Sequence, residues 1–473
     1  MRKPNKKGFT IVELVIVIAV VAILAAVLIP TFVSVTKKAN QSADIQACRQ
    51  MNTYLAVNEV TADKDIVEVY KALEEGGMTA KNYKPLSSNT YYFWDSKLNR
   101  VLYTNENYEV TFPEEYKNVK HTDADHQWYS LNAEIKGDSG YTGKGTGAIS
   151  VNSGAQLYQA VKDLPQSGET WLSKSKGIRG SFQNSINQDT VITLNGDIDM
   201  MGGEFSFGMV SKNVTFTLDG NGHTVRGISN LTNGVDNQKL NGEGKDRNYY
   251  SGIIKYVDEG AKTVTIKNII FEDIVGGKSN VGSAGLLVGN NKGSSLNIEG
   301  VQIRNATLYG KNKLGAFVGA QYAGGCALNI KKTAEGGSIE TKLENVKIIS
   351  TEGESGILFG STSNSGVNDN INIDSQLFTD GYVLVKDCSV VCNSTNVEAL
   401  AETGDYNMTF DGKKVEKSDD KGKYRLTTAY YGFAALNVEY PGTASKFNPI
   451  NTVEQVKAAG WVWDFVNNKK VSA

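Results

Sequence analysis

The sequence predicts a multidomain chain: one long N-terminal α-helix, then a small α+β unit, then a large mainly-β body. Three observations predict this fold class. An almost uninterrupted apolar run fills the first thirty residues, a segment of mixed pattern follows, and short apolar phrases recur between glycine and asparagine turns from about residue 150. A chain of 473 residues is long enough for several domains.

The apolar run begins after a short basic stretch that ends at Gly8. Residues 11–29 are apolar except for Glu13. At 1.5 Å of rise per residue this run is about 28 Å long, which is enough to cross a hydrocarbon core of ~30 Å. The basic residues in front of it favour a cytoplasmic N-terminus and an exported remainder. They are Arg2, Lys3, Lys6 and Lys7.

Glu13 argues against an ordinary signal peptide or signal anchor. A carboxylate inside an apolar span costs about 2.5–3.5 kcal/mol on insertion scales, and a cleaved secretory signal has no reason to carry that cost. The run is also longer than the apolar region of 7–15 residues that is usual in such signals. We therefore interpret Glu13 as functional rather than as a carboxylate that reaches back to the membrane surface.

The segment Lys6-Lys7-Gly8-Phe9-Thr10-Ile11-Val12-Glu13-Leu14 resembles the leader and cleavage motif of type IV prepilins, shared by pilins and type II secretion pseudopilins. The resemblance implies that prepilin peptidase cuts between Gly8 and Phe9 and methylates the new N-terminus of Phe9. It also implies that Glu13 is the family's assembly glutamate and Pro30 its helix-kinking proline. The implied partners are the peptidase, other pilin or pseudopilin subunits and an inner-membrane assembly platform.

Electrostatics agrees with this resemblance. The amine of Phe9 on a neighbouring subunit would pair with Glu13 and turn an unfavourable monomer into a favourable polymer. A proline inside a helix costs about 3 kcal/mol unless the helix bends, so we expect a kink at Pro30. The implied location is the cytoplasmic membrane before assembly and an extracellular filament or the cell surface afterwards.

The N-terminal part divides into a leader (1–8), a helix (9–60, with the span at about 9–30) and a small α+β head (61–135). The second half of the helix carries an apolar stripe at helical spacing, which we expect to pack against the head. We expect the head to contain a short helix near 65–73 and a β-hairpin near 91–103. The stripe consists of Ile45, Cys48, Met51 and Leu55.

One local cluster in the head has side chains of the kind that bind metals: His121, Asp123, Asp125 and His126. Its spacing fits neither a zinc site nor an EF-hand, so a solvated turn is the favoured interpretation. We predict no metal and no cofactor. Five glycines within 136–149 then predict a flexible linker.

Two phrases alternate through the body (150–440), and their recurrence every 30–45 residues predicts a β-solenoid. One is a glycine followed by two apolar residues, and its glycines are 33, 30 and 41 residues apart. They are Gly252, Gly285, Gly315 and Gly356. The other alternates apolar and polar residues and starts at Ile266, Ile298, Leu343 and Val385.

The beginning of the body carries a second resemblance. A helix-like segment at 154–164 precedes strand-like runs at 190–199 and 217–224. This order resembles the first coil of right-handed parallel β-helices of the pectate-lyase-like superfamily, and the resemblance implies architecture rather than activity. Residues 441–473 are expected to cap the last coil.

Enzymatic activity is not the favoured interpretation. The clustered carboxylates of hydrolases, and the base beside acidic calcium ligands of lyases, are not recognisable in the sequence. Asp197 and Asp199 alternate with apolar residues on a strand, His223 belongs to a turn phrase, and Asp419-Asp420 lies beyond the repeats. A net charge of −2 gives no reason to expect a nucleic-acid partner.

Tyrosines on the solenoid provide the candidate binding surface, for an extracellular glycan or a host protein; the alternative is that several of them pack inside the coils. The favoured hypothesis is therefore a minor or tip pilin-like subunit that displays a β-helix for adhesion. The alternatives are a pseudopilin of a type II-like secretion system and a surface-tethered polysaccharide lyase or hydrolase. The binding candidates are Tyr249, Tyr250, Tyr309 and Tyr322.

Overall fold

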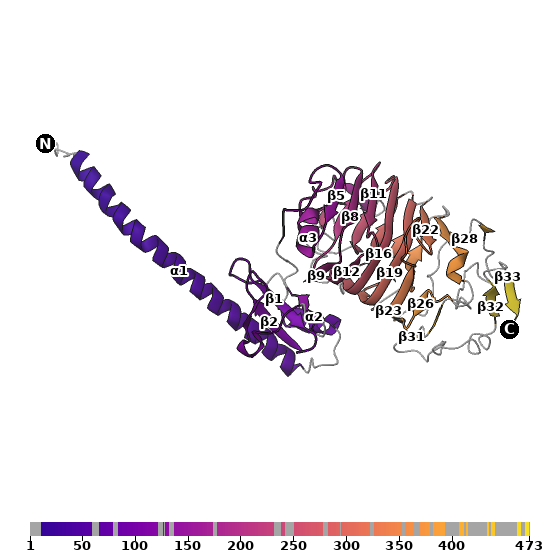
Figure 1. The fold of residues 1–473 in the computed structure, drawn as a ribbon, viewed down its shortest axis with the longest axis horizontal. Coiled ribbons are helices and arrows are strands. Elements are labelled where there is room, and N and C mark those ends of the chain that lie inside the picture. Colours follow the sequence, from indigo (N-terminus) through magenta and orange to yellow (C-terminus); the bar gives the residue numbers. More distant parts are fainter. Residues whose placement is uncertain are drawn as a thin grey trace.

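In the computed structural model the described part of the chain forms a long helix, a small head and a large β body (Figure 1). Described are residues 11–58, 66–78, 84–121, 126, 128–131, 137–173, 177–230, 238–241, 250–277, 282–293, 295–321, 326–351, 355–362, 369–378, 382–392, 406–410, 413–414, 433–434, 437–439, 461–464 and 469–472. Of the candidate residues, Gly8, Phe9, Asp123, Asp125, Tyr249 and Tyr322 lie outside this part.

The N-terminal helix is confirmed. Helix α1 (Ile11–Val57) runs through Pro30 as one helix of 47 residues, which corresponds to about 70 Å. It is long and apolar enough to cross a membrane, with a mean hydropathy of 3.2 over its most apolar window. The kink at Pro30 stays a prediction.

The head packs one helix and one antiparallel sheet against the second half of α1. Helix α2 (Ile66–Glu75) and the hairpin of β1 (Tyr91–Asp95) and β2 (Arg100–Thr104) confirm the expected helix and hairpin. The sheet order is β3-β2-β1-β4, with β3 at Val110–Phe112 and β4 at Trp128–Ser130; the 3-10 helix η1 spans Glu114–Tyr116. The predicted stripe of α1 packs into this head core, where Cys48, Met51 and Leu55 are buried.

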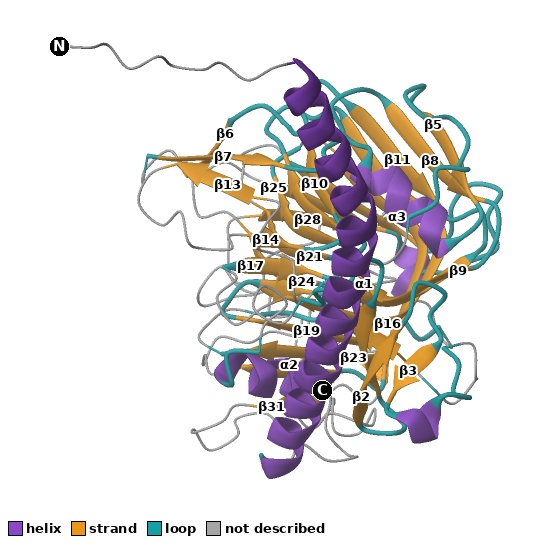
Figure 2. Ribbon diagram, turned by 90° about the vertical axis from the view of Figure 1, so that its left-hand side faces the viewer, coloured by secondary structure: helices purple, strands orange, loops and turns teal. Residues whose placement is uncertain are grey.

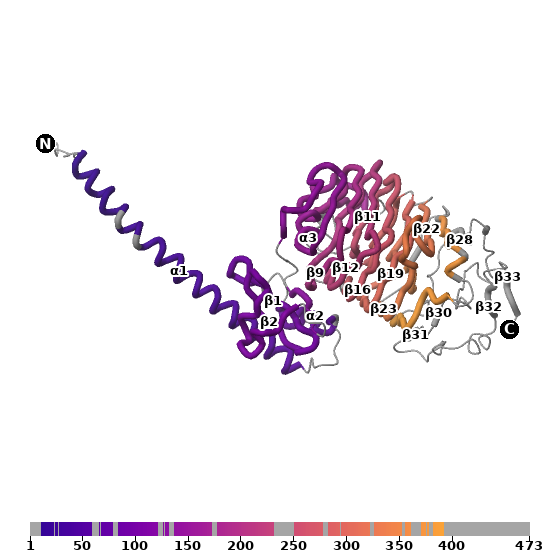
Figure 3. The backbone as a smooth tube through the Cα atoms, in the orientation of Figure 1, coloured from indigo at the N-terminus to yellow at the C-terminus, as the bar shows by residue number. Residues whose placement is uncertain are grey.

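The body is built mainly of parallel strands that pair from one coil to the next, and Figure 3 traces these coils along the chain. Helix α3 (Gly154–Lys162) packs beside the first coil. The largest sheet contains β5 (Ala148–Val151), β8 (Thr190–Leu194), β9 (Ile198–Gly203), β11 (Thr215–Asp219), β12 (Thr224–Ser229), β16 (Thr263–Gly277), β19 (Ser295–Gly310), β22 (Ala327–Lys331), β23 (Lys342–Ser350), β25 (Asp369–Ile373), β26 (Val385–Lys386), β27 (Ser389–Cys392), β28 (Tyr406–Phe410), β29 (Lys413–Lys414), β30 (Phe433–Ala434) and β31 (Asn437–Glu439).

Three smaller sheets complete the described body, and a fourth lies near the C-terminus. Two are parallel: β10 (Phe207–Val210), β15 (Ile254–Val257), β18 (Val288–Asn291), β21 (Val318–Gln321) and β24 (Phe359–Thr362) form one, and β14 (Tyr250–Ser251), β17 (Ser283–Gly285) and β20 (Leu314–Gly315) the other. The remaining two are antiparallel: β6 (Thr170–Ser173), β7 (Ile178–Phe182) and β13 (Gln238–Asn241), and near the C-terminus β32 (Trp461–Asp464) with β33 (Lys469–Ser472). A short 3-10 helix, η2, spans Ser375–Phe378.

The glycine phrases stack on one another as the repeat predicts. Gly285 lies opposite Gly315, and the strands that follow the phrases pair Ile254 with Val288 and Val288 with Val318. A Cβ atom on Gly285 would lie 2.1 Å from the carbonyl oxygen of Val288. This approach is too close for a side chain, so the position requires glycine.

The alternating phrases do not form a single column. Ile266 pairs with Ile298, but Leu343 pairs with Ile303, five residues further along. The reason is that each phrase surrounds a corner residue with positive φ, and each long strand has two corners. The first column of corners contains Asn268 and Gly300, and the second contains Asp273, Asn305, Asn345 and Asp387.

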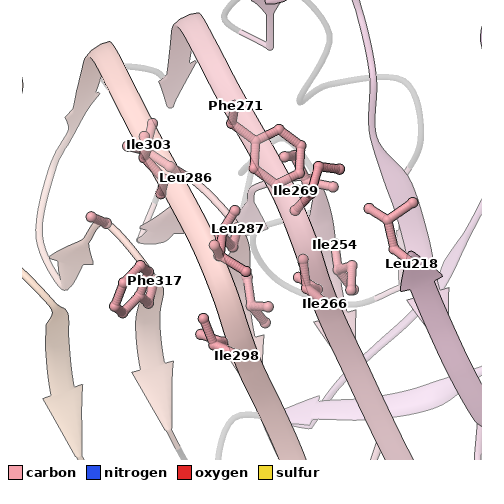
Figure 4. Close-up of a cluster of buried hydrophobic side chains, with 14 of the residues drawn as sticks. Leu218, Ile254, Ile266, Ile269, Phe271, Leu286, Leu287, Ile298, Ile303 and Phe317 are labelled. Atoms are coloured by element: carbon pink, nitrogen blue, oxygen red, sulfur yellow. The ribbon is translucent and has the colours of Figure 1, made fainter. Parts of the chain in front are cut away.

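The inward side chains between Tyr141 and Val390 form one continuous apolar core, and Figure 4 shows part of it. Leu218, Ile266 and Ile298 come from successive coils and are fully buried. Burial of such side chains contributes about 1.5–3 kcal/mol each relative to exposure. Each coil therefore depends on its neighbours to bury its apolar side chains.

The glycines of the predicted linker adopt turn conformations. Gly143, Gly145 and Gly147 have φ between 74° and 83°, a region open to glycine and costly for other residues. Tyr141 beside them is buried in the body core, so the described residues 137–149 pack onto the body. The domain boundaries themselves stay predictions.

Candidate assembly surface and head–body interface

The first half of α1 exposes a continuous apolar surface, which we call the assembly surface (residues 11–35). Large apolar side chains on it are between half and four-fifths exposed, which is far more than a soluble helix leaves uncovered. They are Ile11, Val12, Leu14, Val15, Ile16, Val17, Ile18, Val20, Val21, Leu24, Leu28, Ile29, Phe32, Val33 and Val35. A lipid bilayer or other apolar helices must cover this surface.

Glu13 lies in the first turn of α1, within the assembly surface. A carboxylate there interacts favourably with the positive end of the helix dipole. Pro30 lies near the other end of the surface, and its missing N–H leaves the carbonyl of Ala26 without the usual helical donor.

A buried carboxylate fixes α1 to the head. Asp44 is 1% exposed, and its carboxylate accepts hydrogen bonds from the backbone N–H groups of Leu86 (2.7 Å) and Ser87 (3.0 Å) and from the hydroxyl of Tyr103 (3.1 Å). Its backbone carbonyl accepts a further bond from Tyr92 (3.0 Å). Sequence reasoning missed Asp44, although it precedes Cys48 by four residues and so continues the buried stripe.

A groove of about 670 Å³ opens where α1 leaves the head. On the helix side it is lined by Phe32, Val33 and Lys37, and on the head side by Leu86 and Tyr103 among others. The groove therefore continues the assembly surface into the head.

The two histidines of the candidate metal cluster have separate partners. His126 Nδ1 lies 2.7 Å from Asp95 Oδ2, which also accepts a bond from Trp128 Nε1 (2.9 Å). The ring of His121 packs edge-on against Tyr108 and Trp128. Within the described ranges no three ligating side chains gather into a metal site.

Two of the candidate binding tyrosines are buried, which for these two favours packing over a binding surface. Tyr250 is 5% exposed and stacks on Tyr256, which in turn stacks on Phe182. Tyr309 is 7% exposed and lies beneath the ammonium of Lys71, 4.0 Å from its ring centre. Each is covered by a segment from elsewhere in the chain, the first by β7 and the second by the head.

The head and the body share a packed interface. The Tyr70 hydroxyl donates to the carbonyl of Ser130 (2.5 Å) and lies 2.9 Å from Ser229 Oγ in the body. Burial raises the pKa of Tyr70. Val275 and Tyr309 of the body belong to the head's apolar cluster.

Strand β9 completes this interface. Gly202 has a φ of 70°, and a Cβ atom there would lie 2.2 Å from the Cα atom of Tyr129 in the head.

Asp197 and Asp199 are engaged in pairs along the outer face of the body, whereas Asp419 and Asp420 lie outside the described residues. His223 Nδ1 lies 3.4 Å from Asp197, and Arg226 lies 2.7 Å from Asp199. Strand pairing places Arg226 and Asp199 in one column with charged residues from the following strands. The charges in this column alternate in sign, and we call it the charge ladder. It runs through Asp199, Arg226, Glu272, Arg304, Glu344 and Lys386.

Comparison with known proteins places the N-terminal region in a family. Residues 3–29 match the family described as "Prokaryotic N-terminal methylation motif". The type IV wide pilus major component PilA4 of Thermus thermophilus is 60% identical over 38 residues, which are 8% of this chain and 29% of that protein. The type IV narrow pilus major component PilA5 of the same organism is 34% identical over 85 residues, which are 18% of this chain and 73% of that protein.

Among solved structures, a putative immunoglobulin A1 protease from Bacteroides ovatus aligns over 69% of this chain and 92% of its own, with 12% identity and a TM-score of 0.28. The assembly surface with its single acidic residue, Glu13, fits the family match over residues 3–29. The chain belongs to the type IV pilin family.

Proposed function

We propose that this chain is a pilin-like subunit that prepilin peptidase cuts between Gly8 and Phe9. Other subunits and an inner-membrane platform then assemble it into an extracellular filament through α1. The observation that carries the proposal is the assembly surface, which exposes large apolar side chains and carries a single charged residue, Glu13, near its start. Both curated relatives are pilus components, which supports a pilus rather than a secretion apparatus.

Glu13 gives the assembly step its driving force and its register in this proposal. A carboxylate in the bilayer is costly alone, and the methylated amine of Phe9 on the next subunit would neutralise it. Because the pair is a point contact, it would also set the axial offset between subunits. Before assembly the same helix would anchor the chain with its N-terminus in the cytoplasm.

We further propose that the body is a right-handed parallel β-helix without catalytic activity, displayed for adhesion by a minor or tip subunit. The coil-to-coil parallel pairing and the continuous core support this architecture. Figure 1 places α1, head and body in that order, so a filament built around α1 would carry the body on its outside. A body of this size on every subunit would crowd a closely packed filament.

Mass spectrometry of the native chain tests the processing step. We expect the mature N-terminus to be methylated Phe9; a start beyond residue 25 would contradict the proposal. Glu13→Ala and its closer match Glu13→Gln both remove the charge, so both should insert into the membrane while incorporation into filaments falls at least about tenfold. Filaments that contain either variant at the normal level would show that Glu13 is not the assembly residue.

Immunogold labelling of the body on isolated filaments tests the display role. Labels at few positions or at ends are expected for a minor or tip subunit. Uniform labelling along every filament would exclude it.

A further inference from the structure

We propose that the exposed pair Trp171–Arg179 binds a sugar that carries a carboxylate group. The pair lies on the antiparallel sheet of β6, β7 and β13, called the arm, which projects from the body in Figure 2. This inference rests on the proposed display function and names the class of ligand that the body would contact.

The inner face of the arm is anchored to the body, so its outer face is held in place. Phe182 stacks on Tyr256 with ring centres 5.5 Å apart, and Leu172 and Ile178 are buried in the same cluster. Thr170 donates a hydrogen bond to Asp258 of the body (2.8 Å). A preorganised surface loses little conformational entropy when it binds a ligand.

The outer face presents an indole to solvent. Trp171 is 37% exposed, and among the body residues whose burial the structure describes the only other large apolar side chain this exposed is Val191. An exposed indole offers a flat apolar face that can stack on the ring of a sugar. Trp171 therefore takes the role that sequence reasoning gave to the tyrosines.

Arg179 supplies a cation beside this indole. It pairs with Trp171 across the strands, and its guanidinium carbon lies 4.1 Å from the ring centre. Stacking fixes the plane of the guanidinium, and no carboxylate of the described residues forms an ion pair with it. A guanidinium held in this way can bind a carboxylate through two parallel N–H···O bonds.

Amide groups lie next to this face. Strand alternation places Arg179 and Ser181 on one side of the arm, and Ser181 itself is buried. Gln166 Nε2 donates to Ser181 Oγ (2.9 Å), and Gln166 Oε1 accepts from Gln183 Nε2 (2.9 Å). Primary amides offer both donors and acceptors, so they can match the hydroxyl groups of a sugar.

The size of the site favours a sugar over a protein. One partly exposed indole with its guanidinium is far smaller than the roughly 1,000 Å² that a specific protein interface buries. A uronic acid residue could stack its ring on Trp171, place its carboxylate on Arg179 and direct its hydroxyl groups toward the amides.

Binding of oligogalacturonate and of alginate oligomers to the full-length chain in detergent micelles tests the inference, by calorimetry and by tryptophan fluorescence. Trp171→Ala and Arg179→Gln should each weaken binding at least about tenfold, as loss of a central contact does. Arg179→Lys keeps the charge and loses the planar stack. Its affinity should therefore lie between those of the natural chain and Arg179→Gln. Val191→Ala, an exposed position on another sheet, is the matched control and should bind normally.

The neutral methyl ester of oligogalacturonate should bind as weakly to the natural chain as the free acid binds to Arg179→Gln. Three results would overturn the inference: no binding of either acid, equal binding of the methyl ester, or full affinity of the Trp171 variant. Equal binding of poly-glutamate would reassign the site to acidic peptides. Circular dichroism of each variant verifies its fold.

Filament incorporation, scored on the same variants, separates this inference from the proposed function. The arm variants should assemble normally. If the natural chain binds the acidic oligosaccharides but does not enter filaments, the pilin role is contradicted and the sugar site is supported.

Discussion

At the scale of single residues, burial decides which polar groups matter. Asp44 is enclosed between α1 and the head, and its carboxylate satisfies two backbone N–H groups of a loop that has no regular structure. A buried N–H group without an acceptor costs about 1–3 kcal/mol. The carboxylate thus holds the loop against the helix.

We expect Asp44→Ala to lower the free energy of unfolding of the head by about 2–4 kcal/mol, because both loop N–H groups and the Tyr103 hydroxyl lose their acceptor. Hydrogen exchange should accelerate at the amides of Leu86 and Ser87. Asp44→Asn keeps one acceptor oxygen and serves as the matched control. Its free energy of unfolding should fall by about half as much. Unchanged exchange in the alanine variant would show that the loop is held by other contacts.

Cysteine burial was predictable at this scale, whereas tyrosine burial was not. Cys48 lies on the apolar stripe and is buried as expected, and burial raises its pKa to about 12. Tyr250 shares a cluster with Phe182, about 70 residues away in sequence, and Tyr309 contacts Lys71, about 240 residues away. Local pattern carries no information about such distant partners.

At the scale of elements, the corner residues explain the repeat. An asparagine, aspartate or glycine at each corner adopts a positive φ that most residues avoid. The sequence therefore reveals where corners occur. It cannot show which corner of one coil lies over which corner of the next, because the phrase around both is the same.

Among the residues of the second corner column, Asp273 is the one whose ionised carboxylate lowers the stability of the fold. Burial and the neighbouring Glu272 carboxylate raise its pKa to about 6. The folded state then binds the proton more tightly than the unfolded state, so stability falls as the pH rises from about 4 to 6 and stays reduced above that.

Asp273→Asn keeps the corner conformation, which Asn305 and Asn345 adopt in the same column. It should raise the free energy of unfolding at pH 7.5 by about 1 kcal/mol after solvent screening, with the gain vanishing below pH ~4. Denaturant unfolding at both pH values measures this. A gain of the same size at pH 3.5 would mean that charge is not the cause.

At the scale of the whole molecule, the head and body are packed together, whereas glycine content alone predicted a flexible link. The long helix and the mainly-β body were predictable because each has a strong period. Their relative placement was not, since it depends on contacts such as that of Tyr70 with Ser229, 159 residues apart.

Tyr309→Ala should loosen this interface, because it removes the ring beneath Lys71 and opens a cavity in the shared cluster. Spin labels at Asn99 and Val191, with Cys392 replaced by serine, report the head–body distance; the buried native thiols of Cys48, Cys326 and Cys388 should stay unlabelled. A narrow distribution is expected for the natural interface and a broader one for Tyr309→Ala. A broad distribution in both would mean that the two units move independently.

The charge ladder restricts how the body can change in length. Its signs alternate from Asp199 to Lys386, so the pattern repeats only after every second coil. Loss or duplication of a single coil would bring two acids or two bases into register, and each such contact is unfavourable. Loss or gain of two coils together would keep every charge of the ladder next to one of opposite sign. Bodies of this kind should therefore gain or lose coils in even numbers during evolution.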